Sequence, residues 1–282
     1  MRAVATGRSA PQVGVAYATY VPRLLRDRPG LVDYVEIPFE RLRHDPATSQ
    51  IIQTVPTILH CASLSIGGVV RASKRTLREV RHWATRTATP WVGEHLAFVT
   101  ARGANGEVID VGYTVAPPLN DSSLHRVTTA IGRYERALDK EIILENPPQY
   151  FVTPGSTMSQ GEFILELCEQ SQVGLLLDLS HFLITCHNTA VDPRRAIDRL
   201  PLERTREVHL SGVRREMGSA WDDHGVSAPE EAFDLLGAVL ERATPAAITL
   251  EYNWSAAFSE AVILRDIDRI RRLLCTRSHH DR

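Results

Sequence analysis

The chain has 282 residues, of which 43% are hydrophobic and 23% charged, with a formal net charge of −2 and a sequence pI of about 6.6. This composition is typical of a soluble globular protein, and a charge near zero gives no bulk electrostatic reason to expect nucleic acid or an anionic membrane as a partner. No apolar run of about 18 residues occurs and the N-terminal MRAVATGRSAPQ lacks the apolar core of a signal peptide, so we expect a cytoplasmic protein.

Eight short apolar runs along the chain have the length expected of β-strands. The most strongly apolar of them, VGLLLDL, is typical of a strand that is buried on both faces of a parallel sheet. In chain order the predicted strands are QVGVAY (12–17), DYVEIPF (33–39), PTILHC (56–61), PWVGEHL (90–96), KEIILEN (140–146), VGLLLDL (173–179), REVHLSG (206–212) and AAITLEY (246–252).

Helical patterns lie between these runs. Segments 73–88, 121–138 and 259–275 carry apolar residues at spacings of three and four between charges. The segments SQGEF (159–163) and SAPEEAF (227–233) each place Glu three residues after Ser, which predicts a capping box at the start of a helix.

Eight strands alternating with helices, without a linker or a low-complexity tract, predict a single (β/α)8 TIM barrel of the xylose-isomerase-like kind. The domain spans residues 1–282, with a core of about 12–275 and short disordered tails. A doubly wound open sheet is the alternative, but it normally has fewer strands at this length. No G-x-G-x-x-G, P-loop or G-x-S-x-G motif occurs, so the usual nucleotide-binding and hydrolase signals are absent.

Polar side chains stand where six consecutive predicted strands end. Because these ends surround one mouth of a barrel, the side chains are expected to converge there. The strand-end residues are His60, Glu94, His95, Glu145, Asp178, His209 and Glu251, and the loops that follow add His181, Asp222 and His224. Each alone is compatible with a structural role such as helix capping, but so many together favour a metal site. From this group we select His60, His95, Glu145, Asp178, His181, His209, Asp222, His224 and Glu251 as the candidate ligands.

The charge of this cluster argues for more than one cation. Two carboxylates about 4 Å apart repel by roughly 4 kcal/mol at an effective dielectric constant near 20, and no comparable cluster of Lys or Arg occurs at the strand ends. Nine ligands also exceed what one tetrahedral or octahedral ion uses. Imidazole and carboxylate without thiolate suit Fe, Mn or Zn. The four cysteines, Cys61, Cys168, Cys186 and Cys275, form no C-x-x-C pair, and we expect them to be reduced and without a metal role.

Asp178 and His181, in the stretch GLLLDLSHF, are three residues apart. On a continuing strand this offset would put the two side chains on opposite faces, so their convergence requires the chain to turn directly after Leu179. Ser180 is compatible with that turn. The alternative has His181 capping the next helix or bonding a backbone carbonyl.

Several segments resemble the multinuclear non-heme iron-dependent oxidative enzymes, TIM-barrel proteins that modify ribosomally made peptides, as in methanobactin biosynthesis. The resemblance covers roughly residues 13 to 255, in the family's order. It rests on LHCASLSIGG (59–68), GEHLAF (93–98), ILENPPQY (143–150), LLLDLSH (175–181), EVHLSG (207–212), DDHG (222–225) and LEYN (250–253).

The resemblance implies two or three irons at the strand ends and O2 as co-substrate, with a precursor peptide as the molecule oxidised. Many members of the family need a small partner protein that recognises the leader of the precursor, so the resemblance implies either such a separate partner or direct binding of the leader by this chain. Carried over position by position, the resemblance assigns every candidate except His181 as a metal ligand. At His181 the family pattern has Asn, so His181 would strengthen a third metal site. After Glu251 the family often has an acidic residue, where this chain has Tyr252 and Asn253.

Two other functions fit the same residues. A hydrolase or isomerase of the xylose-isomerase-like class would use Zn or Mn, but the chain lacks an obvious Lys-rich phosphate clamp. A metal-loaded binding or chaperone protein is the third hypothesis. Around the ligands, Glu36 and Glu94 could orient imidazoles or pair with Arg, and Asn146 could bind substrate or hold its loop. Trp221, Tyr252 and Trp254 could wall a peptide pocket or pack over the barrel rim.

Overall fold

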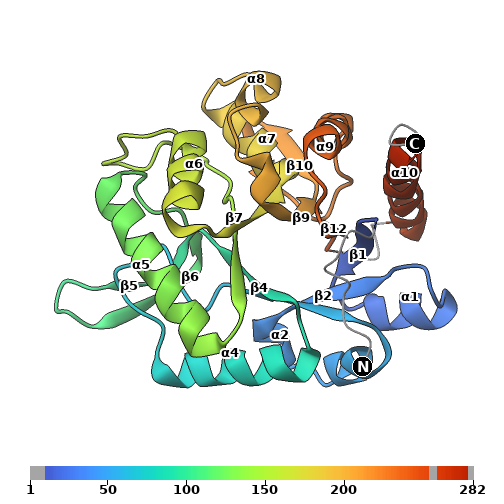
Figure 1. Cartoon of the computed structure of the whole chain (residues 1–282), viewed down its shortest axis with the longest axis horizontal. Helices are drawn as coiled ribbons and strands as arrows, with labels where there is room; N and C mark the ends of the chain where they lie inside the picture. The colour runs from blue at the N-terminus through green and yellow to red at the C-terminus, as the bar shows by residue number, and fades with distance from the viewer. Residues whose placement is uncertain (1–9, 254–258, 279–282) are drawn as a thin grey trace.

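The structure is a computed structural model, which describes residues 10–253 and 259–278 (Figure 1). Eight parallel strands close into a barrel in the order β1-β2-β3-β4-β7-β8-β9-β12, in which β12 pairs with β1. Helices surround the barrel, so the predicted TIM-barrel fold is confirmed. The expected tails fall largely on residues 1–9 and 279–282, which lie outside the described residues. No helix in the described part is long and apolar enough to cross a membrane.

All eight predicted strands form, each within two or three residues of its expected ends. They are short because a barrel strand needs only enough residues to cross the core, and nearly every position in them is buried. The barrel strands are β1 (Gln12–Ala16), β2 (Tyr34–Pro38), β3 (Thr57–Cys61), β4 (Trp91–His95), β7 (Glu141–Glu145), β8 (Gly174–Asp178), β9 (Thr205–Leu210) and β12 (Ala247–Leu250).

The helices bury their apolar faces against the outside of the barrel. The capping box of Ser159 and Glu162 is present at the start of α6. The second predicted box is wrong, because α9 begins at Glu230 behind Pro229 and no side chain caps it. The helices are α1 (Val21–Asp27), α2 (Phe39–Leu42), α3 (Ala47–Thr54), α4 (Lys74–Thr87), α5 (Asp121–Leu138), α6 (Gln160–Ser171), α7 (Leu179–Asn188), α8 (Pro193–Ile197), α9 (Glu230–Arg242) and α10 (Glu260–Ser278), with the 3-10 helix η1 (Leu202–Arg204).

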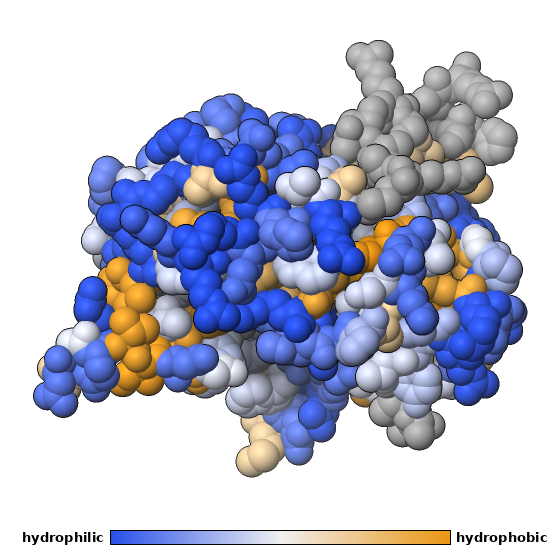
Figure 2. Space-filling view, turned by 90° about the horizontal axis from the view of Figure 1, so that it is seen from below, coloured by the Kyte–Doolittle hydropathy of each residue, from blue (hydrophilic) through white to orange (hydrophobic). Residues whose placement is uncertain are grey.

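Two antiparallel hairpins, which the strand patterns did not reveal, are inserted at the mouth of the barrel. One is β5 (Phe98–Arg102) with β6 (Val108–Val115), and the other is β10 (Val213–Glu216) with β11 (Ser219–Asp222). Their strands are largely exposed, so they lack the continuous apolar pattern of the barrel strands. The first hairpin projects at one end of the molecule, where hydrophobic residues gather on the surface (Figures 1 and 2).

The inside of the barrel has an apolar layer below a polar layer. Because strand side chains alternate between faces, an inward residue is followed by another inward residue two positions later. The inward-facing Tyr34 and Ile58 are thus followed two positions later by Glu36 and His60. In the same way, Ile143 is followed by Glu145 and Leu176 by Asp178. The apolar layer consists of Tyr34, Ile58, Trp91, Ile143, Leu176 and Ala247.

We predict that Gly14→Ala lowers the free energy of unfolding by about 1–3 kcal/mol, because the apolar layer of the barrel has no room for an added methyl group. A Cβ at residue 14 would lie 2.5 Å from the ring of Tyr34, which is fully buried. The matched control is Gly237→Ala in α9, where nothing lies within 4 Å of the added Cβ. Urea unfolding of both variants is the measurement. Equal stability of Gly14→Ala and the wild type would mean that the apolar layer has room for the added methyl group.

Candidate metal centre

All nine predicted ligands lie around the mouth of the barrel, at the carboxyl ends of its strands or in the segments that follow. They form three groups in which one donor atom per residue lies within 4.8 Å of the others. Two of the groups, called the inner groups below, share the carboxylate of Glu145, and the third is called the outer group. The three groups are His60, His95 and Glu145; Glu145, Asp178, His209 and Glu251; and His181, Asp222 and His224, while a fourth group joins Glu36, which was not a predicted ligand, to His60 and His209. That these residues bind metal stays a prediction.

The spacing of the donor atoms has the scale of a coordination shell. Nε2 of His60 and Nε2 of His95 lie 3.3 and 3.2 Å from Glu145 Oε2, and His209 Nδ1 lies 3.3 Å from Glu251 Oε2. Ligands at about 2.1 Å from one ion lie roughly 3.0 Å apart in octahedral and roughly 3.4 Å apart in tetrahedral geometry. A small divalent cation therefore fits between these atoms.

Several buried donor atoms have no hydrogen-bond partner among the described residues. A buried polar atom without a partner destabilises a fold by about 1–3 kcal/mol, so each needs an explanation. The unpartnered atoms include both carboxylate oxygens of Glu145, Asp178 Oδ2, His209 Nδ1 and His224 Nε2. They face one another within the groups above, and every ion pair of their carboxylates has histidine as its partner. This arrangement fits bound cations.

Backbone carbonyls contact Nδ1 of His95 and of His181, and Glu145 Oε1 also lies 3.1 Å from Nδ1 of His181. His95 Nδ1 lies 3.4 Å from the carbonyl oxygen of Cys61, and His181 Nδ1 lies 3.2 Å from that of Asn146. A carbonyl can only accept, so each Nδ1 carries the proton and each Nε2 keeps its lone pair for a metal. His181 Nε2 points toward Asp222, with 3.6 Å between it and Oδ2.

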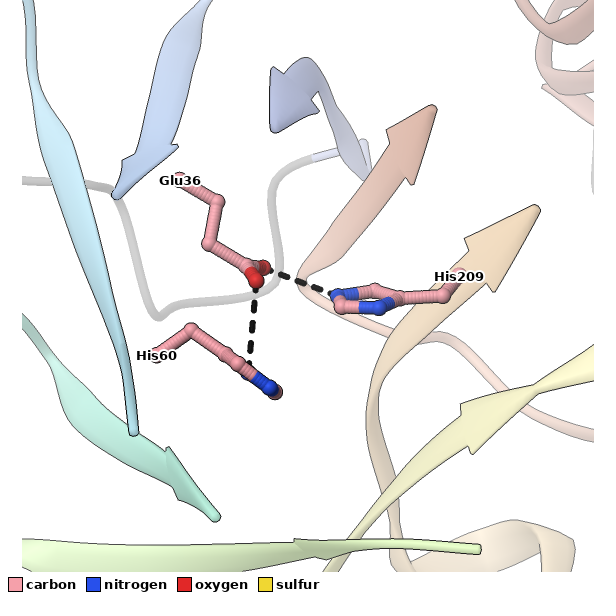
Figure 3. Close-up of side chains that lie close together, drawn as sticks. All are labelled: Glu36, His60 and His209. Carbon is pink, nitrogen blue, oxygen red and sulfur yellow. Dashed lines mark hydrogen bonds and ion pairs between the residues drawn. The ribbon is translucent and has the colours of Figure 1, made fainter. Parts of the chain in front are cut away.

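Glu36 fixes the other two buried imidazoles (Figure 3). One of its oxygens accepts a hydrogen bond from His209 Nε2 at 2.8 Å, and the other lies 3.3 Å from His60 Nδ1. The remaining nitrogen of each ring faces the metal-binding groups. Gly93 leaves room for this arrangement, because a Cβ there would lie 2.8 Å from His60 Nδ1. The suggestion that Glu36 orients imidazoles is therefore supported.

A buried polar network below Glu36 was missed by the sequence analysis. Glu207 accepts hydrogen bonds from Thr249 at 2.7 Å and from the indole of Trp91 at 2.9 Å. Glu207 also lies 3.6 Å from His209 Nε2. Glu207 and Thr249 stand two positions before His209 and Glu251, so strand alternation, which puts them on the same inward face, was the signal that could have found them.

The ionisable groups of the cluster shift one another's pKa values. Burial lowers the pKa of His60, but the carboxylates of Glu36 and Glu145 outweigh it and raise that pKa to about 10. Burial opposes ionisation of Glu251, but His224 and His209 bring its pKa down to about 2. Burial raises the pKa of Glu36 to about 7. A proton on an imidazole such as that of His60 thus balances the nearby carboxylates, a role that metal cations can take over.

Asp178 and His181 lie close together because the chain turns directly after β8, with 3.6 Å between Asp178 Oδ2 and His181 Nδ1, but they belong to different donor groups. The chain enters α7 directly at Leu179, so His181 lies in the first helical turn and the expectation that it lies in a loop is wrong. Asp178 Oδ1 caps this helix by accepting the N–H of His181 at 2.6 Å, while Oδ2 faces the cluster. Asp178 therefore has both a capping oxygen and a free one, and His181 bonds a carbonyl through one nitrogen only.

The remaining polar candidates have structural roles. Glu94 accepts the backbone N–H groups of Leu64 and His95 and orients no ring, so that expectation is wrong. Asn146 bridges β7 and β8 through the backbone of Asp178, at 2.9 Å in both directions, which holds its loop. Tyr252 is buried and donates to Asp266, so it packs below the rim. Trp254 lies outside the described residues.

A cavity of about 310 Å³ opens above the cluster. His95, Glu251 and the group of His181, Asp222 and His224 border it, while the other predicted ligands lie deeper. Aromatic side chains form part of its rim, and Tyr150 stacks on Trp221 with 5.0 Å between ring centroids. The outermost group is therefore the one that a molecule in the cavity meets first.

We predict that Glu36→Gln weakens metal binding by about 10- to 100-fold, because an amide cannot accept a proton from both imidazoles. Competition with a chelator during anaerobic titration with Fe(II), and separately with Zn(II), gives the affinity. Asp266→Asn is the control, since Asp266 is another fully buried carboxylate that contacts none of the candidate ligands. Unchanged affinity in Glu36→Gln would leave Glu36 with a packing role only.

Relatives named "UPF0276 protein" are similar to this chain over most of its length. The protein from Streptomyces avermitilis is 28% identical over 244 residues, which is 84% of this chain and 50% of that protein. The chain thus spans about half the length of this relative. The Caulobacter vibrioides protein is 26% identical over 80% of both chains, and the Bordetella pertussis protein is 30% identical over 68% and 67%.

Solved structures of low sequence identity share the fold. Endonuclease IV from Thermus thermophilus has a TM-score of 0.61 at 14% identity, covering 93% of this chain and 100% of its own. A xylose isomerase domain containing protein from Salmonella typhimurium has a TM-score of 0.59 at 16% identity, covering 95% and 100%. At this identity the likeness shows the xylose-isomerase-like TIM barrel alone.

A family model matches residues 12–275, which span every barrel strand and all nine predicted ligands. Its description is "RiPP precursor modification enzyme MbnB/TglH/ChrH", where RiPP denotes a ribosomally synthesised and post-translationally modified peptide. The match covers nearly the whole chain, and the chain therefore belongs to this family of precursor-peptide-modifying enzymes.

Proposed function

We propose that this protein is an oxidoreductase that uses two or three non-heme irons and O2 to modify a residue of a ribosomally made precursor peptide. The observation that carries the proposal is the set of three donor groups, of which two share Glu145, at the mouth of the barrel. The proposed metal ligands are His60, His95, Glu145, Asp178, His181, His209, Asp222, His224 and Glu251.

The donor types are compatible with iron as well as with zinc or manganese, and the resemblance to iron-dependent peptide-modifying enzymes is what favours iron. The groups combine imidazole with carboxylate and include no thiolate, a set that suits a redox-active first-row metal. Cys61 is buried on the face of β3 opposite to His60, so it cannot join them. A Zn- or Mn-dependent hydrolase or isomerase is the second candidate, and its support is the shared fold with an endonuclease and sugar epimerases.

Bound iron would activate O2, which would accept the electrons that the peptide residue loses. The protein residues hold the site: Glu36 keeps His60 and His209 oriented, and the carbonyls of Cys61 and Asn146 do so for His95 and His181. The cavity above is large enough for a peptide side chain together with its backbone. Its aromatic rim would exclude water from that segment. A separate protein that recognises the leader of the precursor is part of the proposal.

We predict that the number of ions lost depends on which group is changed. His181→Ala should lower the iron content by about one ion, because His181 is a donor in the outer group alone, whereas His181→Asn could keep some binding through its amide oxygen. Glu145→Ala should remove about two ions, because both inner groups use it. Elemental analysis after anaerobic iron loading measures this, with circular dichroism as the check of folding. Equal losses in the two alanine variants would contradict three separate groups.

We predict that modification of the precursor needs both O2 and reduced iron. A short open reading frame beside the gene for this protein is the first candidate precursor, and it should be co-expressed with this protein and with any adjacent small partner. Mass spectrometry should detect an oxidised product in air, no product without O2, and none with His95→Ala. A reproducible single zinc without iron uptake would favour the hydrolase or isomerase alternative instead.

A further inference from the structure

A second hollow, which we call the arginine groove, lies on the outside of the barrel. It has a volume of about 260 Å³ between the segment that follows β3 and the helix α5. Three arginines line it: Arg71 from the segment, and Arg126 and Arg133 from α5. No acidic residue of the described part of the chain lines it. The proposed oxidation uses none of these residues.

The arginines of the groove lack counter-charges within the described residues. Arg126 and Arg133 are half-buried, and none of the three forms an ion pair there. Arg126 donates to Ser123 Oγ at 2.7 Å and to the carbonyl of Ser122 at 3.5 Å, and its Nε is buried without a partner. Cations that have lost part of their hydration without gaining a carboxylate are stabilised by an anionic ligand.

The positive charges are spread along the groove. Arg126 and Arg133 are seven residues apart on α5, so their backbones are separated by roughly 10.5 Å along the helix axis. Arg126 is also held toward the N-terminal end of α5 by its bonds to Ser122 and Ser123, which directs it away from Arg133. A chain that carries several carboxylates matches this spread better than one compact phosphate.

The groove adjoins the cavity above the metal centre across a single hairpin. Gly68 of the groove packs against Phe98 of β5, and Phe98 pairs with Val115 of β6, which lines the cavity. Neighbouring strands are about 4.8 Å apart and an extended residue spans about 3.4 Å. A few residues of extended peptide therefore cross from one hollow to the other. Exposed Val69 offers apolar contact beside the arginines.

We infer that the arginine groove binds an acidic segment of the precursor peptide, a few residues away from the residue that is oxidised. The inference rests on the proposed function for the identity of the ligand. Carboxylates of Asp or Glu side chains would take bidentate bonds from Arg126 and Arg133, and would fix which residue of the peptide enters the cavity.

Fluorescence anisotropy with a labelled hexaglutamate peptide at low ionic strength tests the groove without metal or O2. Hexaglutamate should bind the wild-type protein and hexalysine should not. The double variant Arg126→Gln/Arg133→Gln should bind hexaglutamate at least about tenfold more weakly, a loss of about 1.4 kcal/mol. The double variant Arg78→Gln/Arg136→Gln is the control, because it removes the same charge from α4 and α5 outside the groove.

A further variant covers the case in which the arginine double variant does not fold. Thr129→Glu places a carboxylate at an exposed helical position between the two arginines, and it should weaken hexaglutamate binding to a similar degree. Equal binding by all variants would overturn the inference, as would inorganic phosphate that binds the groove as tightly as the peptide. Arginine-dependent binding together with an iron-free protein would instead overturn only the proposed oxidation.

Discussion

The burial of ionisable groups in the upper layer of the barrel is the constraint on which the rest of the structure depends. Glu145, Asp178 and His209 are almost completely buried, and their partners are other members of the cluster rather than Lys or Arg. A carboxylate in such a place has to be balanced by a proton on an imidazole or by a cation. The fold keeps these groups only because they balance one another.

The polar residues beneath the cluster follow from the same constraint. An imidazole that is to present one nitrogen to a metal must have its other nitrogen bonded, or the ring can turn. Glu36 accepts a hydrogen bond from His209 and lies within ion-pair distance of His60 Nδ1, and Glu207 is held beside it by Thr249 and Trp91. The apolar layer of the barrel supports this network from below, so the order of the cluster depends on packing as well as on charge.

The two hairpins shape what can reach the cluster. The β10–β11 hairpin ends at Asp222 and so carries one predicted ligand, and it also places Trp221 against Tyr150, which lines the cavity. The β5–β6 hairpin separates this cavity from the arginine groove. The barrel fold is shared with an endonuclease IV and with a D-psicose 3-epimerase at low sequence identity, so the fold alone does not set the function.

The sequence by itself determined the barrel and the convergence of its polar residues. Short apolar strands at regular intervals leave few alternatives to a closed parallel barrel, and parallel strands end at one mouth, so His60 and Glu145 had to approach each other. The tertiary structure alone decided how the donors are divided into groups, that Glu145 is shared, and that Glu36 supports two rings whereas Glu94 supports none. These outcomes depend on ring rotation and on strand register across the barrel, which a linear pattern does not encode.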